Sequence, residues 1–256
     1  MRRLLVIGIG AGDPEHVTVQ AVRALNEVDV LFVVDKGEET EDLVTLRREI
    51  CERFIEDPSY RIVELPDPPR DRGAAAYAAA VDDWRGRRAE LWGAALRDEL
   101  PADAVGAFLV WGDPSLYDST LDVIERILAS GQVAFAYEVI PGISSLHALT
   151  ARHRIALNRV GGAVQVTTGR RLAEGGWPEG VDDVVVMLDA RCAFRSVDPE
   201  GVEIFWGAYL GTADELLVAG PLAEVAEEIE RVRAAARERK GWIMDTYLLR
   251  RSRASE

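Results

Sequence analysis

Residues 4–14 read Leu-Leu-Val-Ile-Gly-Ile-Gly-Ala-Gly-Asp-Pro, an apolar run that passes directly into a glycine-rich turn. A continuous apolar run of this length is typical of a strand that is buried on both faces of a parallel sheet. Glycine lets the backbone take a positive φ and approach a ligand closely. The stretch therefore predicts a buried strand followed by a tight loop, which either contacts a ligand or is a plain strand-to-helix turn.

The same order of apolar run and helical pattern recurs through the first half of the chain. The expected strands cover residues 4–8, 30–34, 61–65, 107–111 and 133–140, and the expected helices cover 17–28, 43–55, about 74–100, 120–129 and 144–151. Strands that alternate with helices in this way predict a mostly parallel sheet that is covered by helices on both faces.

The second half has a different rhythm. Strands are expected at residues 164–168, 184–188, 202–206 and 242–249, with one long helix at 222–236. Several of these strands are joined without room for a crossover helix, which predicts a mixed or antiparallel sheet. We expect a domain boundary near residues 157–162, so that residues 1–157 form an N-terminal α/β domain and residues 158–256 form a C-terminal α/β domain.

Composition excludes several classes of protein. The chain has 30 Lys+Arg against 44 Asp+Glu, a net charge of −14, which argues against nucleic-acid binding and against docking on an anionic membrane. No apolar stretch approaches the ~20 residues of a membrane-spanning helix, and glycines interrupt the N-terminal run too early for a cleaved signal peptide. Cys51 and Cys192 stand alone, so we expect no disulfide framework, no zinc site and a cytoplasmic location.

Two more loops follow expected strands. The first is Trp111-Gly112-Asp113-Pro114-Ser115-Leu116-Tyr117-Asp118, and the second is Pro141-Gly142-Ile143-Ser144-Ser145-Leu146. Asp113 either accepts a hydrogen bond from a ligand or caps the next helix. Ser144 or Ser145 either caps the following helix and does nothing more, or leaves the free N–H groups of that helix facing a ligand. Because ligands of open α/β sheets bind at the carboxyl ends of strands, the three loops are expected to converge on one crevice.

Together the three loops resemble the signature of the tetrapyrrole methylases, and the resemblance continues at residues 167–170, 185–188 and 215–222. It covers nearly the whole chain. It implies two α/β domains that hold S-adenosylmethionine (SAM) in the cleft between them. Longer blocks, at residues 108–120 and 151–159 among others, resemble a branch that acts in cobalamin biosynthesis. They imply methylation of precorrin-5 at carbon 1, with release of the acetyl group as acetate.

The resemblance also implies which residues contact the cofactor. They come from the three loops and from four positions of the second half: Gly10, Ala11, Gly12, Gly112, Asp113, Leu116, Ser144, Ser145, Leu146, Met187, Tyr209, Leu210 and Trp242. Met187 is equally compatible with a core position. Because methyl transfer from SAM depends mainly on placing methyl group and carbon in line at ~3–3.5 Å, no catalytic residue is assigned, and no metal site is expected.

The expected substrate is a polycarboxylate, although the chain is acidic. Arginine pairs carboxylates bidentately, so a basic rim that includes Arg152 and Arg159 is one hypothesis, and ordinary solvated surface is the other. The substrate-binding residues we expect are Tyr117, Arg154, Arg170 and Arg171.

Loss of the acetyl group needs an activated water, for which Tyr117, Asp118 and His153 are candidates. His153 lies between two arginines, whose like charge is expected to disfavour its charged form. A surface histidine in a basic turn is the alternative, so none of the three residues is assigned as the base.

Other functions stay open. A sibling precorrin methylase or a diphthamide-type methylase shares the fold. A nucleotide-dependent oxidoreductase is indicated by the first loop and Asp35, but Asp13 stands where the dinucleotide fingerprint needs a third glycine. A non-enzymatic binding module is the third alternative. The family resemblance also implies a homodimer.

Overall fold

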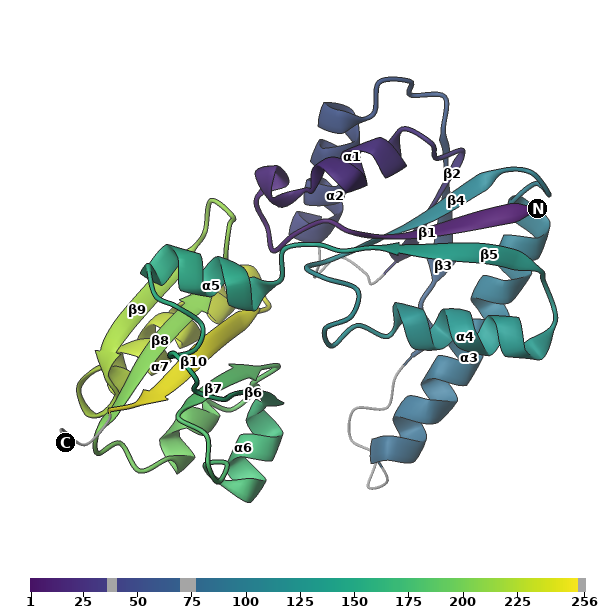
Figure 1. Cartoon of the computed structure of the whole chain (residues 1–256). Coiled ribbons are helices and arrows are strands. Elements are labelled where there is room, and N and C mark those ends of the chain that lie inside the picture. Colours follow the sequence, from purple (N-terminus) through teal and green to yellow (C-terminus); the bar gives the residue numbers. More distant parts are fainter. Residues whose placement is uncertain (36–40, 70–76, 253–256) are drawn as a thin grey trace. The chain divides into compact units, whose positions relative to one another are not determined.

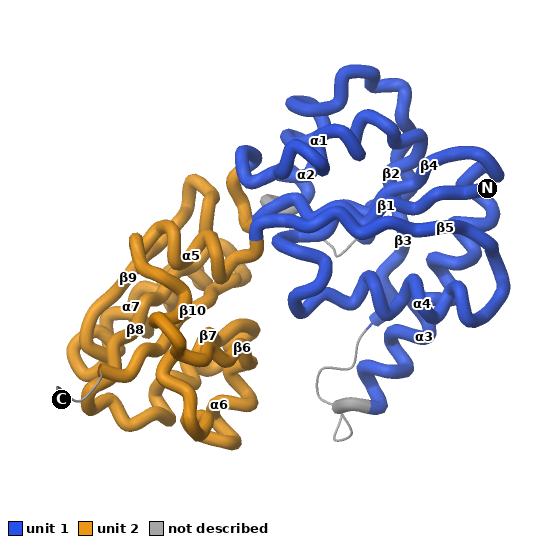
Figure 2. The backbone as a smooth tube through the Cα atoms, viewed as in Figure 1, with its two compact units in different colours: residues 1–10, 14–143 blue, residues 11–13, 144–256 orange. Residues whose placement is uncertain are grey.

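The computed structural model describes residues 1–35, 41–69 and 77–252. The chain divides into two compact units, coloured separately in Figure 2. Unit 1 comprises Met1–Gly10 and Pro14–Ile143, and unit 2 comprises Ala11–Asp13 and Ser144–Glu256. Three residues of the first glycine loop therefore belong to the second unit.

Unit 1 contains a parallel sheet of five strands in the order β3-β2-β4-β1-β5. Its strands are β1 (Arg2–Gly8), β2 (Val30–Asp35), β3 (Arg61–Pro66), β4 (Val105–Val110) and β5 (Phe135–Ile140). Its helices are α1 (Val19–Leu25), α2 (Glu41–Phe54), α3 (Tyr77–Glu99) and α4 (Thr120–Ser130), and a 3-10 turn, η1, covers Pro14–His16. The expected parallel sheet is confirmed.

Strand β1 shows why its sequence is apolar without interruption. Leu4 and Val6 pack into a cluster with residues of α3 and α4, whereas Leu5 and Ile7 pack into a second cluster with residues of α1 and α2. Figure 1 shows these helix pairs on opposite faces of the sheet. Because successive side chains of a strand point to opposite faces, a strand that is covered on both sides needs consecutive apolar residues.

Element ends differ from expectation where local caps decide them. Helix α1 is shorter than the expected 17–28, because the hydroxyl of Thr18 accepts a hydrogen bond from the Ala21 N–H at 3.0 Å and starts the helix at Val19. Strand β5 begins at Phe135 rather than at 133. Of the helix expected at about 74–100, residues 74–76 lie outside the described residues.

Unit 2 contains a second sheet of five strands in the order β6-β7-β10-β8-β9, in which β6 and β7 are parallel and the other pairs are antiparallel. The expected mixed sheet is therefore confirmed. The strands are β6 (Val164–Thr168), β7 (Asp183–Met187), β8 (Val202–Ala208), β9 (Leu216–Pro221) and β10 (Asp245–Arg251). The helices are α5 (Ser145–His153), α6 (Gly169–Gly175) and α7 (Leu222–Lys240), and η3 covers Ala193–Ser196.

Two elements of unit 2 were not expected. Strand β9 alternates half-buried and exposed residues and ends in Gly220-Pro221, a pair that is typical of turns. Helix α6 has only seven residues and is bounded by glycines. Strand β10 begins at Asp245, three residues after the expected 242, and β7 ends at Met187, so that Leu188 already lies in the following turn.

Helix α5 packs against β8 and β10, which places it in unit 2. It buries Leu146 and Leu149, and a Cβ atom on Gly207 of β8 would lie 2.8 Å from the Leu149 side chain. The division by contacts thus falls after Ile143. The boundary expected near 157–162 would have left α5 with the first unit, because an amphipathic helix after a strand looks like part of the same α/β repeat.

The two longest helices, α3 and α7, carry charged residues along their exposed faces. Helix α7 buries Leu222 and Ile229 but also Arg233. Within the described parts of the chain, no helix combines the length and the apolar character that crossing a membrane requires.

Candidate functional site

The three loops of unit 1 begin at neighbouring strand ends. Strand β1 lies between β4 and β5 in the sheet, and Gly8, Val110 and Ile140 end the three strands (Figure 1). Because the strands are parallel, the loops that follow them leave the same edge of the sheet. This edge of unit 1 is the first part of the candidate site.

Close backbone contacts join these loops. A Cβ atom on Gly142 would lie 2.1 Å from the Gly112 carbonyl oxygen, and a Cβ atom on Gly8 would lie 2.6 Å from the Gly142 nitrogen. Gly10 and Gly112 exchange two backbone hydrogen bonds, of 3.3 and 2.8 Å. Glycine at these positions therefore lets three loops pack backbone to backbone, and the expected convergence is found for the parts of the loops that belong to unit 1.

Asp113 ties the second loop to the third. Its Oδ2 accepts a hydrogen bond from the Gly142 N–H at 2.9 Å, and its Oδ1 accepts from the N–H of Ser115 at 2.9 Å and from the Ser115 hydroxyl. Asp113 does not cap a helix, because α4 begins at Thr120 and Ser119 holds the capping position. Whether Asp113 also contacts a ligand stays a prediction.

Tyr117, in the same loop, has a strained backbone. Its φ is +52°, a left-handed conformation that residues other than glycine adopt rarely, and its side chain is 45% exposed. Strain of this kind concentrates at functional sites. The next residue, Asp118, accepts a hydrogen bond from the Thr120 N–H at 2.7 Å, so one of its oxygens supports the start of α4.

In unit 2, the remaining part of the first loop packs on the turn after β8. Gly12 has a φ of +149°, and a Cβ atom there would lie 2.3 Å from the Leu210 carbonyl oxygen. Tyr209, with a φ of +50°, donates its phenolic hydrogen to the Trp242 carbonyl at 2.6 Å and meets the Trp242 ring edge to face at 5.1 Å. Burial raises the pKa of Tyr209, although Lys240 opposes the shift. Unit 2 therefore brings together Gly12, Tyr209, Leu210 and Trp242. Ala11, which precedes Gly12 in the sequence, is also buried.

The turn after β7 carries another predicted residue. Met187 is half-buried at the end of the strand, and Leu188 is 65% exposed with a φ of +53°. Buried Asp189 anchors this turn, because its carboxylate accepts hydrogen bonds from the Ala193 N–H at 2.6 Å and the Tyr247 hydroxyl at 2.7 Å. Burial, reinforced by the nearby Asp189, raises the pKa of Tyr247 far above its ordinary value.

The start of α5 holds the predicted serines. Ser144 occupies the N-cap position, but its side chain does not accept from the helix N–H groups; its Oγ instead lies 2.8 Å from Nδ1 of His147. The Oγ of Ser145 lies 3.3 Å from Oγ1 of Thr246, and Leu146 is buried. Ser144 thus holds the expected cap position, but its side chain makes no cap hydrogen bond. A Ser-x-x-His spacing at a helix start is the signal that could have indicated the His147 contact.

The predicted arginines do not form one group. Arg170 and Arg171 lie in the first turn of α6 and line an open pocket of about 460 Å³ together with Thr167 and Glu174. Arg154 instead ends α5, as its C-cap residue, and does not line this pocket.

The other two arginines of the hypothetical rim make contacts of their own. Arg152 pairs with Glu215 at 2.5 Å, and Arg159 donates to the Arg251 carbonyl at 2.6 Å. Of these five arginines, Arg170 and Arg171 are the two that line one pocket together.

His153 is half-buried rather than a surface residue. Its Nε2 lies 3.0 Å from the Trp206 carbonyl oxygen, and its ring meets Phe205 edge to face at 5.6 Å. Burial lowers the pKa of His153, and the Trp206 carbonyl and Glu215 oppose that shift. The expected direction is thus found, but the cause is desolvation and not the neighbouring arginines.

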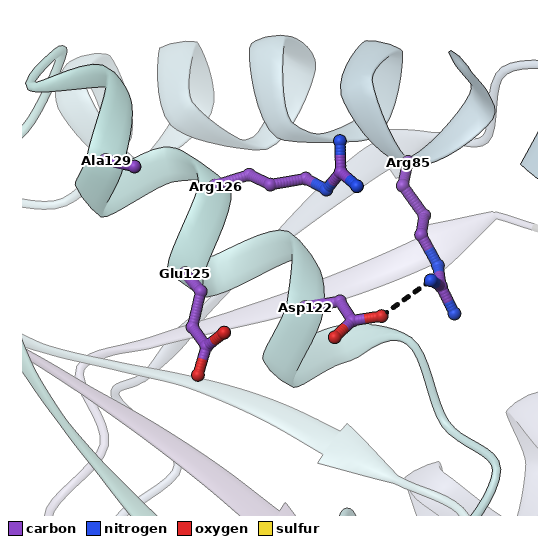
Figure 3. Close-up of a pocket in the computed structure, with 5 residues that line it drawn as sticks. All are labelled: Arg85, Asp122, Glu125, Arg126 and Ala129. Atoms are coloured by element: carbon purple, nitrogen blue, oxygen red, sulfur yellow. Dashed lines mark ion pairs between the residues drawn. The ribbon is translucent and has the colours of Figure 1, made fainter. Parts of the chain in front are cut away.

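A pocket of about 410 Å³ between α3 and α4 contains none of the predicted residues. It is lined by Arg85, Asp122, Glu125, Arg126 and Ala129, and Arg85 pairs with Asp122 at 2.8 Å across it (Figure 3). Arg126 pairs with Asp82. Because both arginines of this pocket are already paired, we do not place the functional site there. Among the described residues no cluster of His, Cys, Asp or Glu has the arrangement of a metal site.

Comparisons with known proteins identify the family of the chain. The sequence profile of the Tetrapyrrole (Corrin/Porphyrin) Methylases matches residues 3–226. A protein of Sinorhizobium sp named precorrin-6A synthase [deacetylating] is 53% identical over 251 residues, which are 98% of this chain and 96% of that protein.

Solved structures point the same way. A putative cobalamin synthesis related protein (CobF) from Corynebacterium diphtheriae has a TM-score of 0.84 at 38% identity, with 98% of this chain and 99% of that chain covered. A uroporphyrin-III C-methyl transferase from Thermus thermophilus, complexed with S-adenosylhomocysteine, shares the fold, with a TM-score of 0.58 at 20% identity over 96% and 91% of the two chains. The chain therefore belongs to the tetrapyrrole (corrin/porphyrin) methylase family.

Proposed function

We propose that this enzyme is a SAM-dependent precorrin-6A synthase, which methylates precorrin-5 at carbon 1 and releases the acetyl group as acetate. The observation that carries the proposal is the 53% identity with the Sinorhizobium precorrin-6A synthase, since it extends over 98% of the chain. The precorrin-2 C(20)-methyltransferase of Sinorhizobium is 32% identical over 56% of the chain.

The methyl donor in this proposal is SAM. Its proposed contacts are the thirteen residues from Gly10 to Trp242 that the family resemblance implies. Gly10 and Gly12 both adopt positive φ values, and glycine loops let a ligand approach the main chain without intervening side chains. The crystallised complex of the Thermus enzyme with S-adenosylhomocysteine supports the same cofactor.

The tetrapyrrole substrate carries carboxylates, and we assign Tyr117, Arg154, Arg170 and Arg171 to it. The support is strongest for Arg170 and Arg171, which line one open pocket. Arg170→Ala and Arg171→Ala are each expected to raise KM for the tetrapyrrole and to leave the affinity for S-adenosylhomocysteine within threefold. Unchanged KM values in both variants contradict the assignment.

The decisive experiment is product analysis by mass spectrometry after incubation of precorrin-5 with SAM that carries a labelled methyl group. One labelled methyl group per product and one acetate per turnover are expected. A parallel reaction with precorrin-2 tests for a sibling activity, and calorimetry with NAD tests the oxidoreductase alternative. The proposal is contradicted if the label is transferred to precorrin-2 but not to precorrin-5, or if the protein binds NAD but does not bind SAM.

We further propose that the enzyme works in the cytoplasm as a homodimer. The support for a reducing compartment is that Cys51 and Cys192 are both free thiols. The dimer rests on family analogy. Light scattering after gel filtration distinguishes the dimer from the 28.2 kDa monomer.

A further inference from the structure

Release of acetate requires a group that activates water, and helix α5 offers two histidines. His147 lies in the first turn of the helix and His153 is its last residue. They therefore stand at opposite ends of a nine-residue helix, and only His147 lies beside the predicted Ser144-Ser145-Leu146 segment. Their surroundings differ as much as their positions.

The ring of His153 makes structural contacts with strand β8. Its Nε2 is bonded to the Trp206 carbonyl at 3.0 Å, which means that this nitrogen carries the proton, and its ring packs edge to face on Phe205. A half-buried ring held in this way anchors the end of α5 on β8. It is not positioned to exchange protons with a substrate.

The ring of His147 is exposed, and one of its nitrogens is held in place. Nδ1 lies 2.8 Å from the Oγ of Ser144, a residue that is only 4% exposed. The backbone on both sides is fixed, since the His147 N–H donates to the Ser144 carbonyl at 3.1 Å and the His147 carbonyl accepts from the Thr150 hydroxyl at 3.1 Å. Within the described part of the chain no group is bonded to Nε2 of His147.

The Ser144 hydroxyl can accept from Nδ1 or donate to it. In the tautomer in which Nδ1–H donates to the Ser144 oxygen, Nε2 keeps its lone pair. An imidazole whose Nδ1 is oriented by a neighbouring oxygen, with a lone pair on Nε2, has the geometry that general bases use to take a proton from water or a hydroxyl group.

Asp118 is a poorer candidate for this task. One of its carboxylate oxygens already accepts a hydrogen bond from the Thr120 N–H at the start of α4.

We propose that His147 is the general base for acetate release and that Ser144 is the positioning residue that orients its ring. The inference rests on the proposed function. Nε2 takes a proton from water while the water oxygen bonds to the acetyl carbonyl carbon. The bond between that carbon and the ring carbon then breaks, acetic acid leaves, and the electron pair stays on the ring carbon, where methyl transfer consumes it. The proton on Nε2 passes to solvent.

The test measures acetate release and cofactor binding in the same variants. His147→Ala is expected to release acetate at least about 100-fold more slowly, the lower end of what general bases contribute, with S-adenosylhomocysteine affinity within threefold of wild type. His153→Gln, on the same helix, is the matched control and is expected to release acetate within threefold of wild type. In ¹⁸O-labelled water, the wild-type enzyme is expected to place one ¹⁸O atom in each acetate.

Ser144 is tested by a conservative pair. Ser144→Ala is expected to slow acetate release about tenfold, and Ser144→Thr, which keeps a hydroxyl group, is expected to restore most of that loss. If His147→Ala releases acetate within threefold of the wild-type rate, the inference about His147 is overturned and the proposed function is not. The same holds if the slower acetate release is fully explained by weaker S-adenosylhomocysteine binding. A wild-type enzyme that forms neither methylated product nor acetate overturns both the inference and the proposed function.

Discussion

The loops at the sheet edge of unit 1 and the turn after β7 in unit 2 are held by different contacts. In unit 1, the loops after β1, β4 and β5 meet through bare backbone at Gly8, Gly112 and Gly142, with the Asp113 carboxylate as the main side-chain tie. In unit 2, a network of buried charged side chains holds the turn after β7. The comparison separates sites that tolerate no added atom from sites that tolerate no lost hydrogen-bond partner.

The network of unit 2 centres on Arg233, which is 7% exposed. Its Nε donates to Oδ2 of Asp245 at 2.9 Å, and a second guanidinium nitrogen donates to the Asp189 carbonyl at 2.6 Å. The Trp206 indole donates to the same Asp245 oxygen at 3.0 Å. A buried pair of this kind adds little net stability, but removal of one partner leaves a charge that water cannot reach.

Arg233→Met therefore has the largest expected effect. It leaves the buried Asp245 carboxylate with the hydrogen bond from the Trp206 indole but without its positive partner, and we expect the free energy of unfolding to fall by about 3–5 kcal/mol in urea titrations. Arg195→Met is the control, because the Arg195–Glu230 pair is about 40% exposed and such pairs contribute about 1 kcal/mol or less. Equal losses in the two variants contradict the contrast between buried and exposed charge.

Gly142→Ala tests the crowded backbone of unit 1. The new methyl group would lie 2.1 Å from the Gly112 carbonyl oxygen, so the loops must separate, and we expect a loss of about 3 kcal/mol, the upper end of ordinary overpacking. Gly86→Ala is the matched control: it lies inside α3 with no atom within 4 Å of its Cβ position and is expected to gain up to about 1 kcal/mol. Thermal unfolding of both variants measures the difference, and two equal shifts rule out a role for close packing.

Asp113→Ala tests how much the Asp113 carboxylate, which joins the second loop to the third, contributes to stability and to cofactor binding. It leaves the Gly142 N–H without its acceptor, which is expected to cost about 1–3 kcal/mol and to weaken S-adenosylhomocysteine binding about tenfold in calorimetry. Asp118→Ala, which removes the contact to the Thr120 N–H and a negative charge near Arg47, is expected to leave that binding unchanged. If Asp113→Ala binds S-adenosylhomocysteine as tightly as wild type, the tie between the loops does not shape the cofactor site.

The smallest expected effect comes from ionisation of the Cys51 thiol, which is buried in unit 1. Burial raises the pKa of Cys51 to about 11 from an ordinary value of 9.0, although a hydrogen bond to Tyr60 opposes the shift. The unfolded chain therefore loses this proton first, and the stabilising contribution is complete below pH 9 and is lost as the pH rises through 11. We expect the free energy of unfolding to fall by roughly 1 kcal/mol from pH 9 to 10. Cys51→Ala should flatten that decline; an unchanged slope means that another group causes it.

Much of the fold could be predicted from the sequence because it depends on local pattern. Consecutive apolar residues such as Leu4–Ile7 require a strand covered on both faces, and glycine loops after parallel strands must leave one edge of the sheet. These two facts predicted the sheet of unit 1 and the meeting of its loops.

The rest depends on tertiary contacts that leave no periodic signal. Strand β9 forms because it pairs with β8 in an antiparallel ladder. Helix α5 belongs to unit 2 because Leu149 packs against Gly207. The buried Arg233 looks in sequence like any other charge on an exposed helix face, and the Ser-x-x-His spacing allows the contact between His147 and Ser144 without fixing the rotamer that makes it. Only the folded chain reveals such side-chain partnerships.

Two of the left-handed backbone positions described above, at Tyr117 and Leu188, carry exposed side chains. Glycine would relieve the conformational penalty at each of them, of order 1–3 kcal/mol, without opening a cavity in the core. The bulky side chains at these two turns therefore cost the fold stability that glycine would give back. Enzymes with glycine at the two positions should be more resistant to unfolding, and their turnover measures what the side chains contribute in return.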